Sequence, residues 1–220
     1  MRLLPDSVQV TVSSENVRAQ PNGVRIGKLH NGDVIHIRKR VGNWLLFYNE
    51  KYDSAYIWAP STGFAYINLY NPHTYFDTTR GQFYPLNYFR QLFGSEGEII
   101  QDYPSEYVLF FEGLGLGSHE ETVIEVVSSR TQEVKHGIQL FISKENGGIK
   151  AVKVDFLRPV KGLKAASKKC GIPGTHPGVE NARHVHWERD TLIKGLAVEL
   201  ERKEWESAWF SGISFKTIED

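Results

Sequence analysis

Hydrophobic and polar positions alternate in two similar stretches of the C-terminal half of the chain. Each stretch contains a glycine followed by an alternating segment, then a polar turn, then a second segment that closes on phenylalanine. The first stretch covers residues 136–142 and 152–156, and the second covers residues 194–200 and 211–215. A period of two is typical of a β-sheet with one buried and one solvent-facing side. The pattern therefore predicts a β-hairpin that occurs twice.

Helical spacing of hydrophobic positions accompanies these hairpins. We expect a short helix over residues 88–93 and a second helix that begins at Ser118, where Glu121 completes a capping box. A third helix is expected over residues 161–170, and it ends at Gly171, because glycine readily adopts the left-handed conformation that terminates a helix.

These elements define the organisation of the C-terminal part. Residues 107–220 are predicted to form a duplicated α+β domain, with units at about 107–156 and 157–217 and with helices on one face of the sheet. Residues 71–106 begin with aperiodic turn-forming residues and continue with closely spaced aromatic residues. We interpret them as a linker or aromatic crossover segment that packs against the domains.

The N-terminal part reads as short strands separated by turns. Residues 34–38 and 44–48 are rich in β-branched and aromatic side chains, and Asn-Gly pairs at 22–23 and 31–32 are typical of tight turns. This pattern predicts a small all-β barrel or sandwich over residues 1–70.

The order of turns and strands in this part resembles the bacterial Src-homology-3-like domain. The residues that carry the resemblance are Asn16-Val17-Arg18, Pro21-Asn22-Gly23, Ile26-Gly27-Lys28-Leu29, Asn31-Gly32-Asp33-Val34, Gly42-Asn43-Trp44 and Gly63-Phe64-Ala65-Tyr66-Ile67. The chain departs from the family where Phe64 replaces the usual Trp and where residues 50–61 look like an insertion. The resemblance implies a β-barrel that recognises other molecules, often cell-wall peptides, and that carries no catalytic residues of its own.

Aromatic side chains are the candidates for partner contact, because they offer a large contact area at a low entropic cost. The expected contact residues are Tyr52, Tyr56, Trp58, Phe64, Tyr66 and Trp209. The alternative is that about half of the aromatic residues in the N-terminal part fill the core of a small barrel.

Composition narrows the functional classes. The 220 residues contain 26 Lys plus Arg and 26 Asp plus Glu, so no net charge attracts the chain to nucleic acid or to an acidic membrane. A single cysteine excludes an internal disulfide and a multi-cysteine metal site. We expect no cofactor. The N-terminus lacks the apolar core of a signal peptide, so we expect a cytoplasmic protein, or a periplasmic one if an export signal has been trimmed.

Residues with possible catalytic or metal-binding chemistry are few. His184 and His186 share one face of an expected strand and are weak candidates for a metal site, with Val185 and Trp187 facing the core. Cys170 lies near a helix C-terminus, where a thiol is a small hydrophobic group rather than a nucleophile. Three further segments have ordinary structural interpretations: the glycines of residues 113–117 as a tight turn, the lysines of residues 161–169 as a solvated face, and the charged residues 199–206 as a solvated hairpin.

The predicted tandem layout loosely resembles the beta-lactamase inhibitor protein and several bacterial immunity proteins. That resemblance is architectural, and no residue is carried over from those proteins. Together these observations favour a non-enzymatic protein-binding protein, an immunity or inhibitor protein that neutralises a toxin by steric occlusion. The residues leave open a cell-wall or peptide-binding module and a cysteine peptidase.

Overall fold

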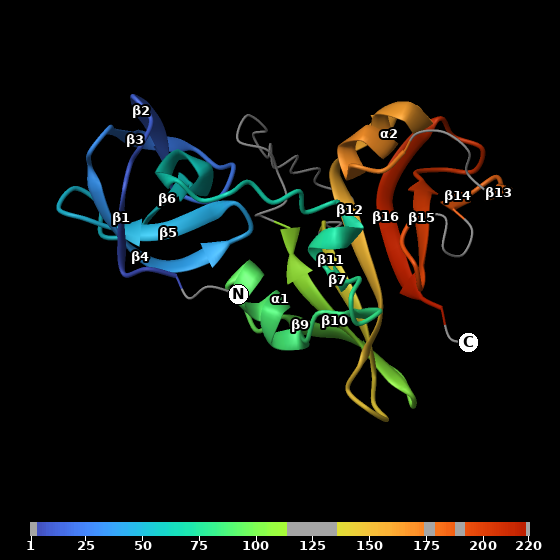
Figure 1. Ribbon diagram of the computed structural model, residues 1–220. Coiled ribbons are helices and arrows are strands. Elements are labelled where there is room, and N and C mark those ends of the chain that lie inside the picture. The colour runs from blue at the N-terminus through green and yellow to red at the C-terminus, as the bar shows by residue number, and fades with distance from the viewer. Residues whose placement is uncertain (1–3, 114–135, 174–178, 188–191, 219–220) are drawn as a thin grey trace, which may run out of the picture. The chain divides into compact units, whose positions relative to one another are not determined.

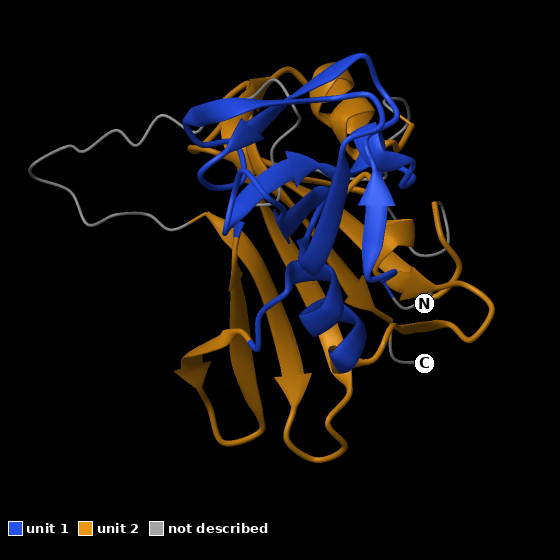
Figure 2. Cartoon of the chain, turned by 90° about the vertical axis from the view of Figure 1, so that its left-hand side faces the viewer, with its two compact units in different colours: residues 1–67, 87–96, 113–135 blue, residues 68–86, 97–112, 136–220 orange. Residues whose placement is uncertain are grey.

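The computed structural model describes residues 4–113, 136–173, 179–187 and 192–218. The chain divides into two compact units (Figure 2). Unit 1 contains residues 1–67, 87–96 and 113–135, and unit 2 contains residues 68–86, 97–112 and 136–220. Both units are built mainly from antiparallel sheets, and the described residues contain two α-helices (Figure 1). None of the described helices is long and apolar enough to cross a bilayer.

Unit 1 is organised around a six-stranded sheet in the order β1-β4-β5-β6-β2-β3. Its strands are β1 (Ser7–Gln9), β2 (Ser14–Arg18), β3 (Arg25–His30), β4 (Val34–Val41), β5 (Trp44–Tyr48) and β6 (Ala55–Trp58), followed by the 3-10 helix η1 (Ala59–Thr62). The sheet is open within the described residues, with β1 and β3 at its two edges. A small β-barrel was predicted over residues 1–70. The β-strands of this part are confirmed, but the sheet of the described residues is open and not a closed barrel.

The core of unit 1 is made mainly of inward-facing side chains from these strands, together with Val10, which follows β1. It contains Val10, Val17, Leu29, Ile35, Leu45, Phe47, Ala55 and Ile57. The helix α1 (Leu86–Phe93) confirms the helix expected over residues 88–93, and all but its first residue belongs to unit 1. The backbone N–H of Gly42 donates to the carbonyl of Leu92, which fixes the end of this helix to the β4–β5 turn.

Unit 2 is organised around an eight-stranded antiparallel sheet in the order β13-β14-β15-β16-β12-β11-β10-β9. Its strands are β9 (Glu98–Asp102), β10 (Glu106–Glu112), β11 (Gly137–Ser143), β12 (Ile149–Lys161), β13 (Val179–Glu180), β14 (His184–Trp187), β15 (Leu196–Arg202) and β16 (Trp209–Thr217). Two four-stranded meanders, β9–β12 and β13–β16, therefore join through their last strands, and Val154 of β12 lies opposite Ile213 of β16.

One face of this large sheet is buried. The segment 68–86 contributes the 3-10 helix η2 (Pro72–Thr74), the short strands β7 (Phe76–Asp77) and β8 (Gln82–Phe83), and the aromatic rings that pack on the buried face. The ring of Tyr70 meets Phe156 edge-on at 5.2 Å, and the ring of Tyr75 lies 6.0 Å from Phe215. The predicted linker or crossover segment 71–106 is divided between the units: residues 87–96 belong to unit 1 and the rest to unit 2.

The helix α2 (Leu163–Cys170) also contacts β12 and β16 (Figure 1). It confirms the helix expected over residues 161–170, and Gly171 ends it in the left-handed conformation with φ of 66°. The side-chain amide of Asn68 donates to the carbonyl of Lys169 at 3.0 Å, so segment 68–86 satisfies a carbonyl that the helix end leaves open. The helix expected from Ser118 lies outside the described residues.

The two predicted hairpins are present as β11–β12 and β15–β16, but their registers differ. In the first hairpin, Ile138 lies opposite Val154. Their counterparts in the second stretch are Leu196 and Ile213, and these are not opposite each other, because Leu196 lies opposite Thr217. The two sequence stretches therefore agree in strand order and differ in pairing.

Candidate functional site

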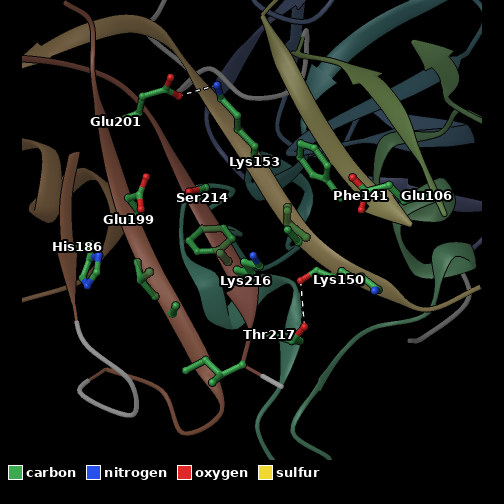
Figure 3. Close-up of a pocket in the computed structure, with 16 residues that line it drawn as sticks. Glu106, Phe141, Lys150, Lys153, His186, Glu199, Glu201, Ser214, Lys216 and Thr217 are labelled. Carbon is green, nitrogen blue, oxygen red and sulfur yellow. Dashed lines mark hydrogen bonds and ion pairs between the residues drawn. The ribbon is translucent and has the colours of Figure 1, made fainter. Parts of the chain in front are cut away.

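The second face of the eight-stranded sheet is open, and it is the candidate site. On β14, β15, β16, β12 and β11, buried side chains alternate with half-buried or exposed ones. We use the name open face for the outward side chains Gln139, Phe141, Ala151, Lys153, Asp155, His184, His186, Ala197, Glu199, Glu201, Ser214 and Lys216. Part of this face forms a shallow groove with a volume of about 840 Å³ (Figure 3).

Charged side chains of opposite sign meet on the open face, in one case between neighbouring strands and in the other across the strand that lies between them. The Nζ atom of Lys153 lies 2.6 Å from Oε2 of Glu201 (Figure 3). The Nε2 atom of His184 lies 3.2 Å from Oε1 of Glu199. All four side chains remain about one-third exposed, and such ion pairs contribute only about 0.2–1 kcal/mol each. These pairs therefore add little to stability, and water or a partner's charges can replace them.

Asp155 is a half-buried carboxyl group of the open face. Burial raises the pKa of Asp155 above its usual value, and the charge of Glu201 adds to this effect. Lys153, the backbone N–H of Gly137 and His136 act in the opposite direction. The carboxylate of Asp155 is therefore held in a position where its charge is poorly solvated.

We expect Asp155→Asn to stabilise the protein at pH 7. An acid whose pKa is raised by folding favours the folded state while it is protonated, and this advantage is lost as the pH rises through the folded pKa. The gain from the substitution should therefore disappear below about pH 4, near the pKa of a solvated Asp. Urea unfolding of the variant and the unmodified chain across pH 3–8 measures this difference in the free energy of unfolding. Asp102→Asn is the control: Asp102 is exposed and its Oδ1 lies 2.5 Å from Nζ of Lys144, so no gain at pH 7 is expected.

The expected aromatic contact residues of unit 1 differ widely in exposure. Trp58 is only 9% exposed and meets the ring of Trp44 edge-on at 5.2 Å, so it is part of the packed interior. Tyr66 is 58% exposed, with its ring 6.2 Å from that of Trp58. Phe64 is half-buried under the guanidinium group of Arg40 at 5.7 Å. Trp58 and Tyr66 are therefore neighbours, and only Tyr66 of the two offers its ring to solvent.

The remaining aromatic candidates are placed as follows. Tyr52 is half-buried and packs edge-on against Phe47 at 6.1 Å. Tyr56 is also half-buried, and burial raises the pKa of its hydroxyl group. Trp209 belongs to unit 2, is 44% exposed, and lies with its ring 5.9 Å from Nζ of Lys161. The six predicted contact residues therefore belong to two units.

The predicted alternation of residues 184–187 is confirmed. Val185 and Trp187 are buried, and the two histidines lie on the open face, where each is half-buried. His184 contacts Glu199. The described residues contain no group of three side chains that could hold a metal ion.

Cys170 is fully buried at the end of α2. Burial raises the pKa of its thiol far above the usual value, and the nearby charge of Lys169 only partly opposes this effect. A cysteine nucleophile requires a lowered pKa, because the thiolate is the reactive form. The environment of Cys170 therefore does not support the peptidase alternative.

The lysines of residues 161–169 are only partly the solvated face that was predicted. Lys161, Lys164 and Lys168 are exposed, as a solvated face requires, but the ammonium group of Lys169 lies 4.7 Å from the ring centre of Tyr70. Of the glycine-rich stretch 113–117, all but its first residue lies outside the described residues.

The sequence interpretation missed most of the open face. The interpretation of residues 199–206 as a solvated hairpin leaves out that Glu199 and Glu201 lie in strand β15 and are paired with residues of two other strands. Lys153, Asp155 and Lys216 were not selected at all. They could have been found from the polar positions of each alternating segment, because these positions share one face of the sheet. The chain matches no protein-family model, and neither the curated proteins nor the solved structures compared with it include a match.

Proposed function

We propose that this chain is a non-enzymatic protein-binding protein that inhibits its partner by covering it, as a bacterial immunity or inhibitor protein does. The observation that supports the proposal is the open face: one side of a wide sheet carries charges of both signs that contribute little to folding. A surface with both signs of charge favours a complementary protein surface over a uniformly charged polymer. Phe141 and the alanines of the same face supply apolar contact between the charges.

A duplicated origin of unit 2 is part of this proposal. Its two meanders have the same strand order and meet at their last strands, where Val154 lies opposite its counterpart Ile213. The different registers of the two hairpins limit the duplication to strand order. Joining two four-stranded sheets in this way doubles the width of the open face, and a wide face is what a protein interface of standard size needs.

Charge reversal on the open face tests the proposal. We expect the double variant Lys153→Glu/Lys216→Glu to lose its partner in a quantitative pull-down from the native host, with at least about a tenfold lower yield than the unmodified chain. The control is Arg25→Glu/Lys28→Glu on the exposed side of β3, which should retain the partner. In addition, the captured protein should lose its own activity in the complex. Equal loss in both variants would contradict a role for the open face.

The second candidate is a cell-wall or peptide-binding module, in which unit 1 acts as a bacterial Src-homology-3-like domain. The exposed ring of Tyr66, which lies 6.2 Å from the ring of Trp58, favours it, because a pre-organised aromatic side chain is a common contact for peptides. Co-sedimentation with purified cell wall that is lost in Tyr66→Ala and retained in Lys153→Glu/Lys216→Glu would support this candidate over the inhibitor.

A further inference from the structure

The edges of the sheets differ in how they are protected from pairing with another strand. An exposed edge presents unpaired backbone N–H and C=O groups, and proteins usually protect it with short strands, charged side chains or proline. Strands β1, β7, β8 and β13 are edges of only two or three residues. Strand β3 is longer, but it carries the exposed cations Arg25 and Lys28.

Strand β9 is less protected, because its charged side chains, Glu98 and Asp102, lie only at its two ends. It has five residues, all exposed, and it forms the edge of the eight-stranded sheet beside β10 (Figure 1). Ile99 is 59% exposed and Ile100 is 43% exposed, and Tyr103, the next residue after the strand, is also exposed. The strand contains no lysine, arginine or proline. Two adjacent exposed isoleucines on an edge are a combination that proteins normally avoid.

The pairing of β9 with β10 leaves one residue without a counterpart. Ile99 lies opposite Leu109 and Gln101 lies opposite Val108, so Ile100 is the extra residue of a β-bulge. A bulge can protect an edge by twisting it away from a partner. Here the bulge leaves both isoleucines exposed, so the apolar surface of the edge persists.

We propose that β9 accepts an extended segment of a partner protein as a ninth strand of the sheet. Strand addition of this kind gains its affinity from backbone hydrogen bonds and its specificity from the side chains beside them. The isoleucines in the middle of β9 would pack best against β-branched residues in the middle of the incoming segment. Its two ends carry the carboxylates of Glu98 and Asp102, which call for lysine or arginine at the ends of the segment.

The same charges disfavour a second copy of this chain as the occupant. Antiparallel pairing of two β9 strands about Ile100 would place Glu98 of each copy opposite Asp102 of the other. Like charges directly opposite each other destabilise a strand pair. Lys144 pairs with Asp102 in each copy and so reduces this repulsion at both contacts, but no cation lies within the strand itself.

The test uses the full chain labelled for NMR and a capped peptide of sequence Lys-Val-Thr-Val-Thr-Lys as the probe. We expect the peptide to shift the amide resonances of residues 98–103 and to slow hydrogen exchange in this strand. A peptide with Glu in place of both Lys should bind about tenfold more weakly at low salt, because both ends would then repel the edge. A peptide with proline at its centre should not bind, because proline cannot donate to a sheet ladder.

Two protein variants make the test specific. Ile100→Lys gives β9 the protection that β3 already has, and it should abolish the shifts while leaving the urea midpoint unchanged. Ile26→Lys on β3 is the matched control and should bind the peptide as the unmodified chain does. The proposal is overturned by equal binding of the proline peptide, by the absence of shifts at millimolar peptide, or by shifts confined to the open face. Self-association through β9 in sedimentation experiments would also overturn it.

Discussion

Replacing Phe215 with alanine is expected to lower the free energy of unfolding of unit 2 by about 3–5 kcal/mol. Phe215 is fully buried in β16, opposite Val152 of β12 and Val198 of β15, and its ring packs near Tyr75. Its removal leaves a cavity where the two meanders join and where segment 68–86 covers the sheet. Urea unfolding, followed by hydrogen exchange of the amides in β15 and β16, measures the loss.

Phe141→Ala is the matched control on the opposite side of the same sheet. Phe141 lies on the open face opposite Ala151 and is only half-buried. Because part of its apolar area is already in water, its truncation should cost less than that of Phe215, about 1–2 kcal/mol. Equal losses for the two variants would mean that both faces of the sheet are covered, and the open face would then no longer be a candidate site.

Several strands of both units could be predicted because their pattern is local. The alternation of residues 184–187 fixes which side chains face inward, and Gly171 marks the end of α2 wherever the helix packs. Pairing between distant strands could not be predicted in this way. The contact of β12 with β16, and the bulges that shift their register after Asp155, depend on how whole meanders meet.

The candidate site has the same non-local origin. Lys153 and Glu201 lie on strands that are separated in the sheet by β16, and their ion pair exists only because of that strand order. In sequence they are ordinary polar residues of two alternating strands. The exposure of an aromatic residue is equally non-local, because the side chains that cover it come from elsewhere in the chain. Trp44, which packs edge-on against Trp58, is supplied by the preceding strand.

Trp58→Ala is expected to destabilise unit 1 by about 3–5 kcal/mol, because the substitution opens a cavity beside Trp44 at the end of β6. Tyr66→Ala, which removes the exposed neighbour, should change the free energy of unfolding by no more than about 0.5 kcal/mol, as for most surface substitutions. Thermal unfolding of the two variants, with partner or cell-wall binding measured on the same samples, compares them directly.

The two variants together test whether the aromatic residues of unit 1 that were predicted to contact a partner, here called the aromatic series, form a contact surface or only a core. If this series is a contact surface, Tyr66→Ala should weaken binding while unit 1 remains folded, because its ring supplies the exposed area of the pair. If the series is only core, Tyr66→Ala should leave binding unchanged, and Trp58→Ala should reduce binding only in proportion to the unfolded fraction. A stable Trp58→Ala variant that no longer binds would contradict the packing of Trp58 against Trp44, and would assign the contact to the tryptophan itself.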